Sequence, residues 1–205
     1  KLNKTLKMLT WIVKEMIDNL NSLLWLAFDN CVLYSPSPSD YVYWYPDDDQ
    51  VPTKDEDTEN QNVHVIYYEP DKRPDSPVVL FCHGSTGNNT MRKYVYDASR
   101  MLNINIIIWD YPHFGKSVKK NNGITPSHQK NYDAAREVVN HVVEKWNIPT
   151  SRLCFWGESI GGTYAAFLAS EHHDALGLIL WSAFSSLSDM LKDHGSMILH
   201  TLRKR

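Results

Sequence analysis

From residue 78 onward, short apolar runs alternate with longer segments in which apolar side chains recur every three to four positions. Short apolar runs are typical of buried strands, and the three-to-four spacing is typical of helices that bury one face. With two aromatic and β-branched runs nearer the N-terminus, the expected strands cover 41–45, 63–68, 78–82, 104–109, 153–156 and 176–181. The expected helices cover 91–102, 126–148, 163–170 and 187–199. This alternation predicts an α/β fold with a mostly parallel sheet and helices on both faces.

A stretch rich in serine and proline, residues 35–40, divides the chain. We expect an N-terminal amphipathic helix within residues 1–34 and an α/β domain over residues 41–205. The acidic residues 47–60 follow the first expected strand and are rich in turn formers, so a solvated loop is expected there.

The N-terminal helix is expected over residues 8–28, where apolar side chains recur at helical spacing. Charged and amide side chains interrupt this segment, and a spanning helix needs about 20 nearly continuous apolar residues, so no transmembrane helix is expected. Two interpretations stay open. The helix either packs on the domain or lies on a membrane surface, with Trp11 and Trp25 as interfacial anchors.

Charge and cysteine content argue against several classes of function. The 205 residues carry 24 acidic and 21 basic side chains, and no basic stripe indicates a nucleic-acid partner. Cys82 and Cys154 lie in expected buried strands, which argues against a disulfide framework and for a reducing compartment. No Cys-x-x-Cys or His-x-x-x-His spacing occurs, so neither a metal nor another cofactor is expected. A nucleotide site is not expected either, because Asp110 replaces the first glycine of a phosphate loop.

The segment Gly157-Glu158-Ser159-Ile160-Gly161-Gly162 lies between an expected strand and an expected helix. In that context Gly-x-Ser-x-Gly predicts a nucleophile elbow, a tight turn that projects the serine Oγ above the sheet. Gly157 and Gly161 remove side chains that would clash across this turn. The helix that follows directs its first backbone N–H groups toward a developing negative charge. Ser159 is therefore the candidate nucleophile.

His83-Gly84-Ser85 follows the strand 78–82. A backbone N–H of this turn, together with that of Ile160, predicts a two-donor oxyanion hole. His83 has two interpretations, as a catalytic base or as a histidine that orders the turn through hydrogen bonds, and the second is favoured.

These segments and their spacing resemble the α/β-hydrolase-domain proteins of the serine-aminopeptidase-like superfamily. The motifs that carry the resemblance are His83-Gly84-Ser85-Thr86-Gly87-Asn88, Asp110-Tyr111-Pro112-His113-Phe114-Gly115-Lys116-Ser117, Pro126-Ser127 and Gly157-Glu158-Ser159-Ile160-Gly161-Gly162. The chain looks most like the small, often membrane-anchored branch that includes protein depalmitoylases.

The resemblance covers roughly residues 60–190 and implies Ser159 as nucleophile, with the main-chain N–H groups of Ser85 and Ile160 as oxyanion donors. It implies a substrate with an acyl ester, thioester or amide bond, either a small acyl compound or an acylated protein. In that branch an N-terminal hydrophobic segment often tethers the enzyme to a membrane. With the cysteine usage, we therefore expect an intracellular protein, cytoplasmic or peripheral to a membrane that the N-terminal helix contacts.

The chain departs from the family pattern in two places. His113 occupies a position where the family commonly has glycine, so a locally different turn is expected. The acid and the histidine follow the nucleophile in this fold, and the resemblance places them after two further strands. We expect neither in this chain, which looks like a domain truncated after about the sixth strand. Asp189 and His194 are an alternative acid and base, although they lie about one helical turn apart.

Two functions therefore compete. The first is a serine hydrolase, of which this chain is the N-terminal part and is inactive alone. The second is an inactive binding or scaffold protein with the same fold, either a pseudoenzyme or a truncated gene product.

Overall fold

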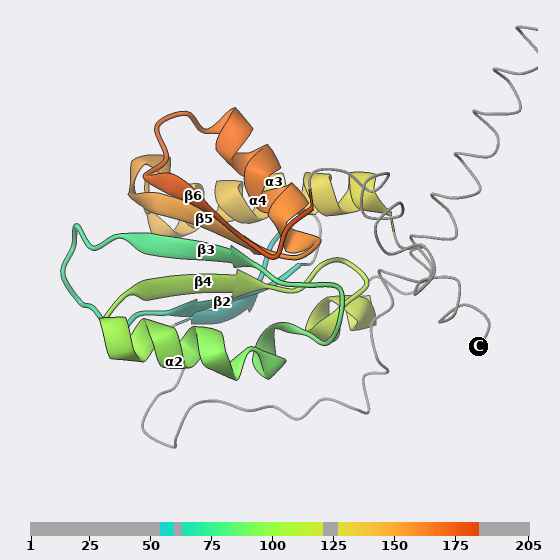
Figure 1. Cartoon of the computed structure of the whole chain (residues 1–205), viewed down its shortest axis with the longest axis horizontal. Helices are drawn as coiled ribbons and strands as arrows, with labels where there is room; N and C mark the ends of the chain where they lie inside the picture. The colour runs from blue at the N-terminus through green and yellow to red at the C-terminus, as the bar shows by residue number, and fades with distance from the viewer. Residues whose placement is uncertain (1–53, 60–62, 121–126, 185–205) are drawn as a thin grey trace, which may run out of the picture.

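Six strands form one sheet in the computed structural model, which describes residues 54–59, 63–120 and 127–184. Across the sheet the strands follow the order β1-β2-β4-β3-β5-β6 (Figure 1). The strands are β1 (Lys54–Asp57), β2 (His64–Tyr68), β3 (Val78–Cys82), β4 (Asn105–Trp109), β5 (Leu153–Glu158) and β6 (Gly177–Trp181). The helices are α2 (Lys93–Leu102), α3 (His128–Trp146) and α4 (Gly161–Glu171), with 3-10 turns at Asn89–Met91, Gly115–Lys120 and Thr150–Arg152.

The four strands β4, β3, β5 and β6 are parallel, while β1 and β2 extend the sheet in antiparallel pairing. This confirms the mostly parallel sheet expected from the sequence. After β3 the chain forms β4 on one side of that strand and β5 on the other. Such a switch point opens a crevice at the carboxyl ends of the strands, where α/β proteins place their ligands.

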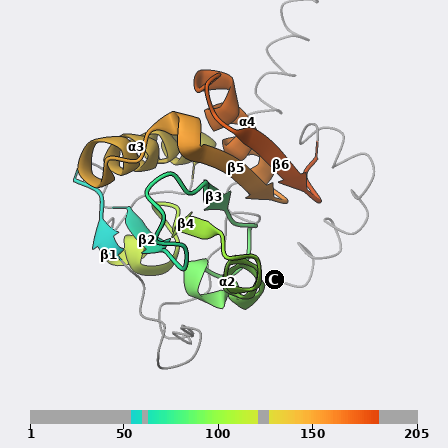
Figure 2. The same ribbon diagram turned by 90° about the vertical axis from the view of Figure 1, so that its left-hand side faces the viewer.

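Helices cover both faces of the sheet, as expected. Figures 1 and 2 show α3 and α4 against one face and α2 against the other. Alternate residues of β3 supply the two cores: Val78, Leu80 and Cys82 pack with α3 and α4, whereas Phe81 packs with α2. A buried central strand needs apolar residues on both sides, which explains its continuous apolar run.

The acidic segment 47–60 was expected to be a loop, and this is wrong for residues 54–57, which form β1. Its register with β2 pairs Lys54 with Tyr67 and Asp57 with His64. The Lys54 ammonium also lies 4.9 Å from the centre of the Trp146 ring, a cation–π contact. Pairing with β2 and contact with α3 are distant interactions, and they override the weak strand propensity of acidic residues.

β6 forms one edge of the described sheet. Its last four residues are apolar, and each is between 41% and 52% exposed. The expected strand 41–45 and the expected helices 8–28 and 187–199 lie outside the described residues, as do Asp189 and His194. Within the described part of the chain, no helix has the length and apolar character needed to cross a bilayer.

Candidate active site

Ser159 occupies the two-residue connection between β5, which ends at Glu158, and α4, which begins at Gly161. Its φ angle is +53°, in the left-handed region. A non-glycine residue in that region costs about 1–2 kcal/mol, so the surrounding structure must hold it there. The backbone supplies part of that restraint, because the N–H of Ser159 donates to the carbonyl of Trp181 at 2.9 Å.

The elbow glycines are sterically required. A methyl group at Gly157 would lie 2.5 Å from the carbonyl oxygen of Gly161, across the turn. A methyl group at Gly161 would lie 2.6 Å from the carbonyl oxygen of His83 and still closer to that of Cys82. The absence of both side chains lets α4 begin directly against the end of β3.

Ile160, the residue directly before α4, already has α-helical angles, φ −61° and ψ −30°. The N–H groups of Gly162 and Thr163 donate to Ser159 and Ile160 at 3.0 Å, as the first turn of α4 closes. No described residue accepts a hydrogen bond from the N–H of Ile160. Free N–H groups at a helix start carry partial positive charge and suit an anion.

The second expected donor follows the neighbouring strand. Cys82 at the end of β3 pairs with Gly157 of β5, so the loop that begins at His83 starts beside the elbow. In this loop the N–H of Gly84 donates to Glu158 Oε2 at 3.2 Å. The N–H of Ser85 has no acceptor among the described residues, and the Ser85 side chain is half-buried. The structure thus brings Ser85 and Ile160 to adjacent strand ends.

His83 is completely buried. Its ring stacks on Tyr111 at 4.2 Å between centroids and meets the edge of Phe114 at 5.1 Å. Nδ1 lies 2.7 Å from the carbonyl oxygen of Gly84. Burial, with a smaller effect from the nearby Arg92 charge, lowers the pKa of His83 to about 3. These contacts suit a neutral histidine that orders the turn, the interpretation favoured from the sequence.

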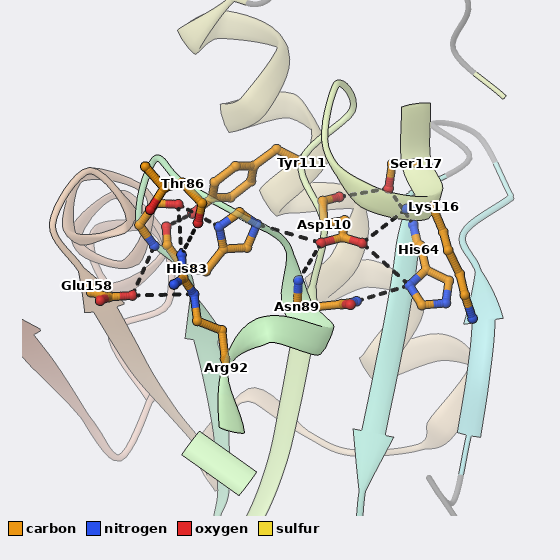
Figure 3. A network of polar contacts seen from close by, with 11 residues as sticks. His64, His83, Thr86, Asn89, Arg92, Asp110, Tyr111, Lys116, Ser117 and Glu158 are labelled. Carbon is orange, nitrogen blue, oxygen red and sulfur yellow. Dashed lines mark hydrogen bonds and ion pairs between the residues drawn. The ribbon is translucent and has the colours of Figure 1, made fainter. Parts of the chain in front are cut away.

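Asp110 joins the loops that follow β3 and β4 (Figure 3). Its carboxylate accepts the N–H of Asn89 at 2.7 Å and the N–H of Lys116 at 3.2 Å. His64 and His83 each lie 3.8 Å from one of its oxygens. Burial raises the pKa of Asp110 to about 6. From the sequence, Asp110 counted only as a mismatch to a phosphate loop and as part of a family motif, and its hub role was not predicted.

The turn after β4 does not need a glycine at position 113. Among the described residues of this turn, the left-handed angle falls at Gly115, with φ +48°, and not at His113. A side chain at Gly115 would collide with the carboxylate of Asp110. His113 therefore needs no left-handed backbone here, and the expected local difference from the family's turn stays a prediction.

Glu158 and Arg92 also reach this site, and sequence reasoning missed both. Glu158 occupies a variable position of the Gly-x-Ser-x-Gly pattern, and Arg92 precedes α2, so neither position carries a motif signal. Among the described residues, no cluster of three or more histidine, cysteine or carboxylate side chains is arranged to hold a metal.

Comparisons with known proteins agree with this architecture. The model of the family described as serine aminopeptidase, S33, matches residues 73–204. Protein bem46 of Schizosaccharomyces pombe is 26% identical over 161 residues, which cover 76% of this chain and 50% of bem46. Alpha/beta hydrolase domain-containing protein WAV2 of Arabidopsis thaliana is 30% identical over 116 residues, 56% of this chain and 36% of WAV2. An uncharacterised protein of Acanthamoeba polyphaga mimivirus is 29% identical over 160 residues, 66% of this chain and 51% of that protein.

The chain thus spans about half, or less, of the length of these relatives. Among solved structures, an esterase of Pyrococcus furiosus superposes with a TM-score of 0.56 at 20% identity, over 68% of this chain and 53% of the esterase. An alpha-beta hydrolase of Vibrio vulnificus gives 0.53 at 22% identity, over 67% and 51%. These likenesses identify the α/β-hydrolase fold that the sequence predicted.

Proposed function

The chain belongs to the serine aminopeptidase S33 family, and on that premise we propose that it is part of a serine hydrolase with Ser159 as nucleophile. The observation that carries the proposal is the backbone of Ser159. Ser159 has φ +53° between a strand and a helix, and the glycine on either side of it has no room for a side chain. This backbone lowers the stability of the fold, so a purely structural role does not explain it. A nucleophile that must stand clear of the sheet accounts for that cost.

In the proposed reaction, Ser159 Oγ attacks the carbonyl carbon of an acyl ester, thioester or amide and forms a tetrahedral intermediate. The N–H groups of Ser85 and Ile160 receive the oxyanion, and the start of α4 adds its positive dipole end. A histidine accepts the serine proton and then delivers it to the leaving group, so that an acyl-enzyme remains for water to hydrolyse. We place that histidine and its acid outside the described residues.

The proposed substrates are small acyl compounds or acylated proteins. The structural relatives named as an esterase and a hydrolase are consistent with acyl-bond chemistry in this fold. A peripheral membrane location, with contact through residues 8–28, remains part of the proposal because it suits acylated substrates.

A fluorophosphonate probe with an intact-mass readout tests the assignment. We expect one adduct on the parent chain, or on the longer protein if the base lies beyond this chain, and none on Ser159→Ala. Ser85→Ala is the matched control, because it removes a site hydroxyl but keeps the backbone N–H, and it should still be labelled. Labelling that survives Ser159→Ala would refute the nucleophile. Folded full-length protein without labelling would favour the inactive binding or scaffold alternative.

A further inference from the structure

We infer that Glu158 and Arg92 are positioning residues that aim the loop after β3, so that the N–H of Ser85 and not that of Gly84 faces the reacting carbonyl. Neither residue is assigned such a role by the family motif. The inference about the loop stands on contacts in the structure, and its catalytic meaning rests on the function proposed above.

Glu158 is the last residue of β5 and directly precedes Ser159. Its Oε2 accepts the N–H of Gly84 at 3.2 Å and the hydroxyl of Tyr94 at 2.8 Å. The side chain is only 23% exposed, so water competes weakly for these bonds. Hydrogen bonds to an ionised carboxylate are about twice as strong as neutral ones. The strand that carries the nucleophile therefore holds the neighbouring loop directly.

Arg92 contacts both the same loop and Glu158 (Figure 3). Its Nε lies 3.6 Å from Glu158 Oε2, and its terminal nitrogen donates to the carbonyl oxygens of Gly84, at 3.4 Å, and of Thr86. The side chain is 12% exposed, and Arg92 is the residue from which α2 starts. A rigid planar guanidinium can serve a carboxylate and two carbonyl groups at once, which a lysine ammonium does less well.

Together with His83, the two side chains orient the peptide groups of Gly84. Its N–H is directed at Glu158, and its carbonyl oxygen lies 2.7 Å from His83 Nδ1 and 3.4 Å from the Arg92 terminal nitrogen, so neither group is available to a substrate. The next N–H along the loop, that of Ser85, has no acceptor among the described residues. Because Glu158 and Ser159 are consecutive, one short segment both carries the proposed nucleophile and orients the proposed oxyanion donor, the N–H of Ser85. Loss of one such donor typically lowers the rate by about 10²–10³.

The test compares Glu158→Ala, Glu158→Gln and Arg92→Lys with the parent. Glu69→Gln is the matched control. Like Glu158, Glu69 accepts a hydrogen bond from a tyrosine hydroxyl, at 2.9 Å, and its side chain is 26% exposed. It follows β2, which is antiparallel to its neighbour β4, so it lies at the opposite end of the sheet from the proposed site. The first readout is the amide of Gly84 in NMR spectra. Labelling histidine carbonyl carbons and glycine nitrogens selects the amide signals of Gly84 and Gly195, the glycines that follow a histidine. The signal that disappears in Gly84→Ala is that of Gly84. The second readout is saturation kinetics of fluorophosphonate labelling.

In Glu158→Ala we expect the Gly84 amide to shift upfield and exchange about tenfold faster, because its charged acceptor is gone. We expect kinact for labelling to fall by about tenfold or more, with KI little changed. Glu158→Gln keeps an acceptor oxygen and should fall between Glu158→Ala and the parent in both readouts. Arg92→Lys should slow labelling as well, and Glu69→Gln should match the parent.

An unchanged Gly84 amide in Glu158→Ala would overturn the inference. So would a changed amide with an unchanged kinact, because the clamp would then have no positioning role. If neither the parent chain nor the longer protein is labelled, the proposed function fails on its own, and the Gly84 amide still decides whether Glu158 and Arg92 aim the loop.

Discussion

The backbone N–H of Ser159 donates to the carbonyl oxygen of Trp181 at 2.9 Å. Trp181 is the last residue of β6 and pairs in register with Glu158. Its ring packs edge-on against Tyr94 of α2, at 5.4 Å between centroids. The turn of the proposed nucleophile therefore depends on the strand at one edge of the described sheet, and its unusual backbone is held from this adjacent strand as well as by its own glycines.

Backbone strain at Ser159 can be measured directly. Ser159→Gly should be about 0.5–1 kcal/mol more stable than Ser159→Ala in urea unfolding. Glycine adopts φ +53° without steric cost, although part of that gain is offset by the freedom glycine has in the unfolded chain. The same pair of substitutions at Ser170, within α4, should give the opposite order, because glycine weakens a helix. Equal stability of the two variants at position 159 would mean that the turn is unstrained.

Close approach of α4 to β3 predicts a sharp contrast between two glycines. Gly161→Ala should lower the free energy of unfolding by about 1–3 kcal/mol or more. Its methyl group would overlap the backbone carbonyls of Cys82 and His83, which are fixed at the end of β3. Gly177→Ala should be tolerated, because the nearest atom to its methyl group is the Cys154 sulfur, 4.0 Å away. Thermal unfolding of both variants checks this, and a stable Gly161→Ala protein would contradict the observed start of α4.

The parts of the fold that could be predicted are those with a local signal. The apolar run of β5 and the helical repeat of α4 bracket the turn at Ser159, and the glycines around that serine mark its geometry. Each of these signals lies within a few residues of the feature it predicts. The two strand ends that carry Ser85 and Ile160 could also be expected to meet, because carboxyl ends of parallel strands lie at one edge.

Contacts between distant residues could not be predicted in this way. Glu158 meets Gly84 across 74 positions, and Asp110 meets Asn89 across 21, in each case through a side chain and a backbone N–H. Apolar periodicity carries no information on such pairs. The strand β1 escaped prediction for the same reason, because its charged residues are ordered by pairing with β2.

The hub at Asp110 should be important for stability. Asp110→Ala removes the acceptor of two backbone N–H groups in a site that water does not reach, which should cost about 3 kcal/mol. Asp97→Ala is the control, since Asp97 makes an exposed i,i+4 pair with Lys93 and should cost under about 1 kcal/mol. Urea unfolding at pH 7.5 measures both. A loss at Asp110 no larger than that at Asp97 would show that the loops after β3 and β4 do not depend on the carboxylate.

Burial of neutral His83 predicts an acid-sensitive fold. The pKa of His83 is lowered from an ordinary value near 6.5 to about 3. Between these two pH values His83 is protonated in the unfolded chain and neutral in the folded chain. The free energy of unfolding is therefore unaffected by titration of this residue above pH 6.5 and falls by about 1.4 kcal/mol for each pH unit below it, until about pH 3.

His83→Phe keeps an aromatic ring against Tyr111 and Phe114 but cannot titrate. At pH 7.5 the variant should be about 1 kcal/mol less stable than the parent, because the contact with the Gly84 carbonyl is lost. Between pH 6.5 and 5 the difference should close and then reverse, a relative gain of about 2 kcal/mol. Urea unfolding at several pH values checks this, and curves for parent and variant that stay parallel from pH 7.5 to 5 would rule out the buried neutral histidine.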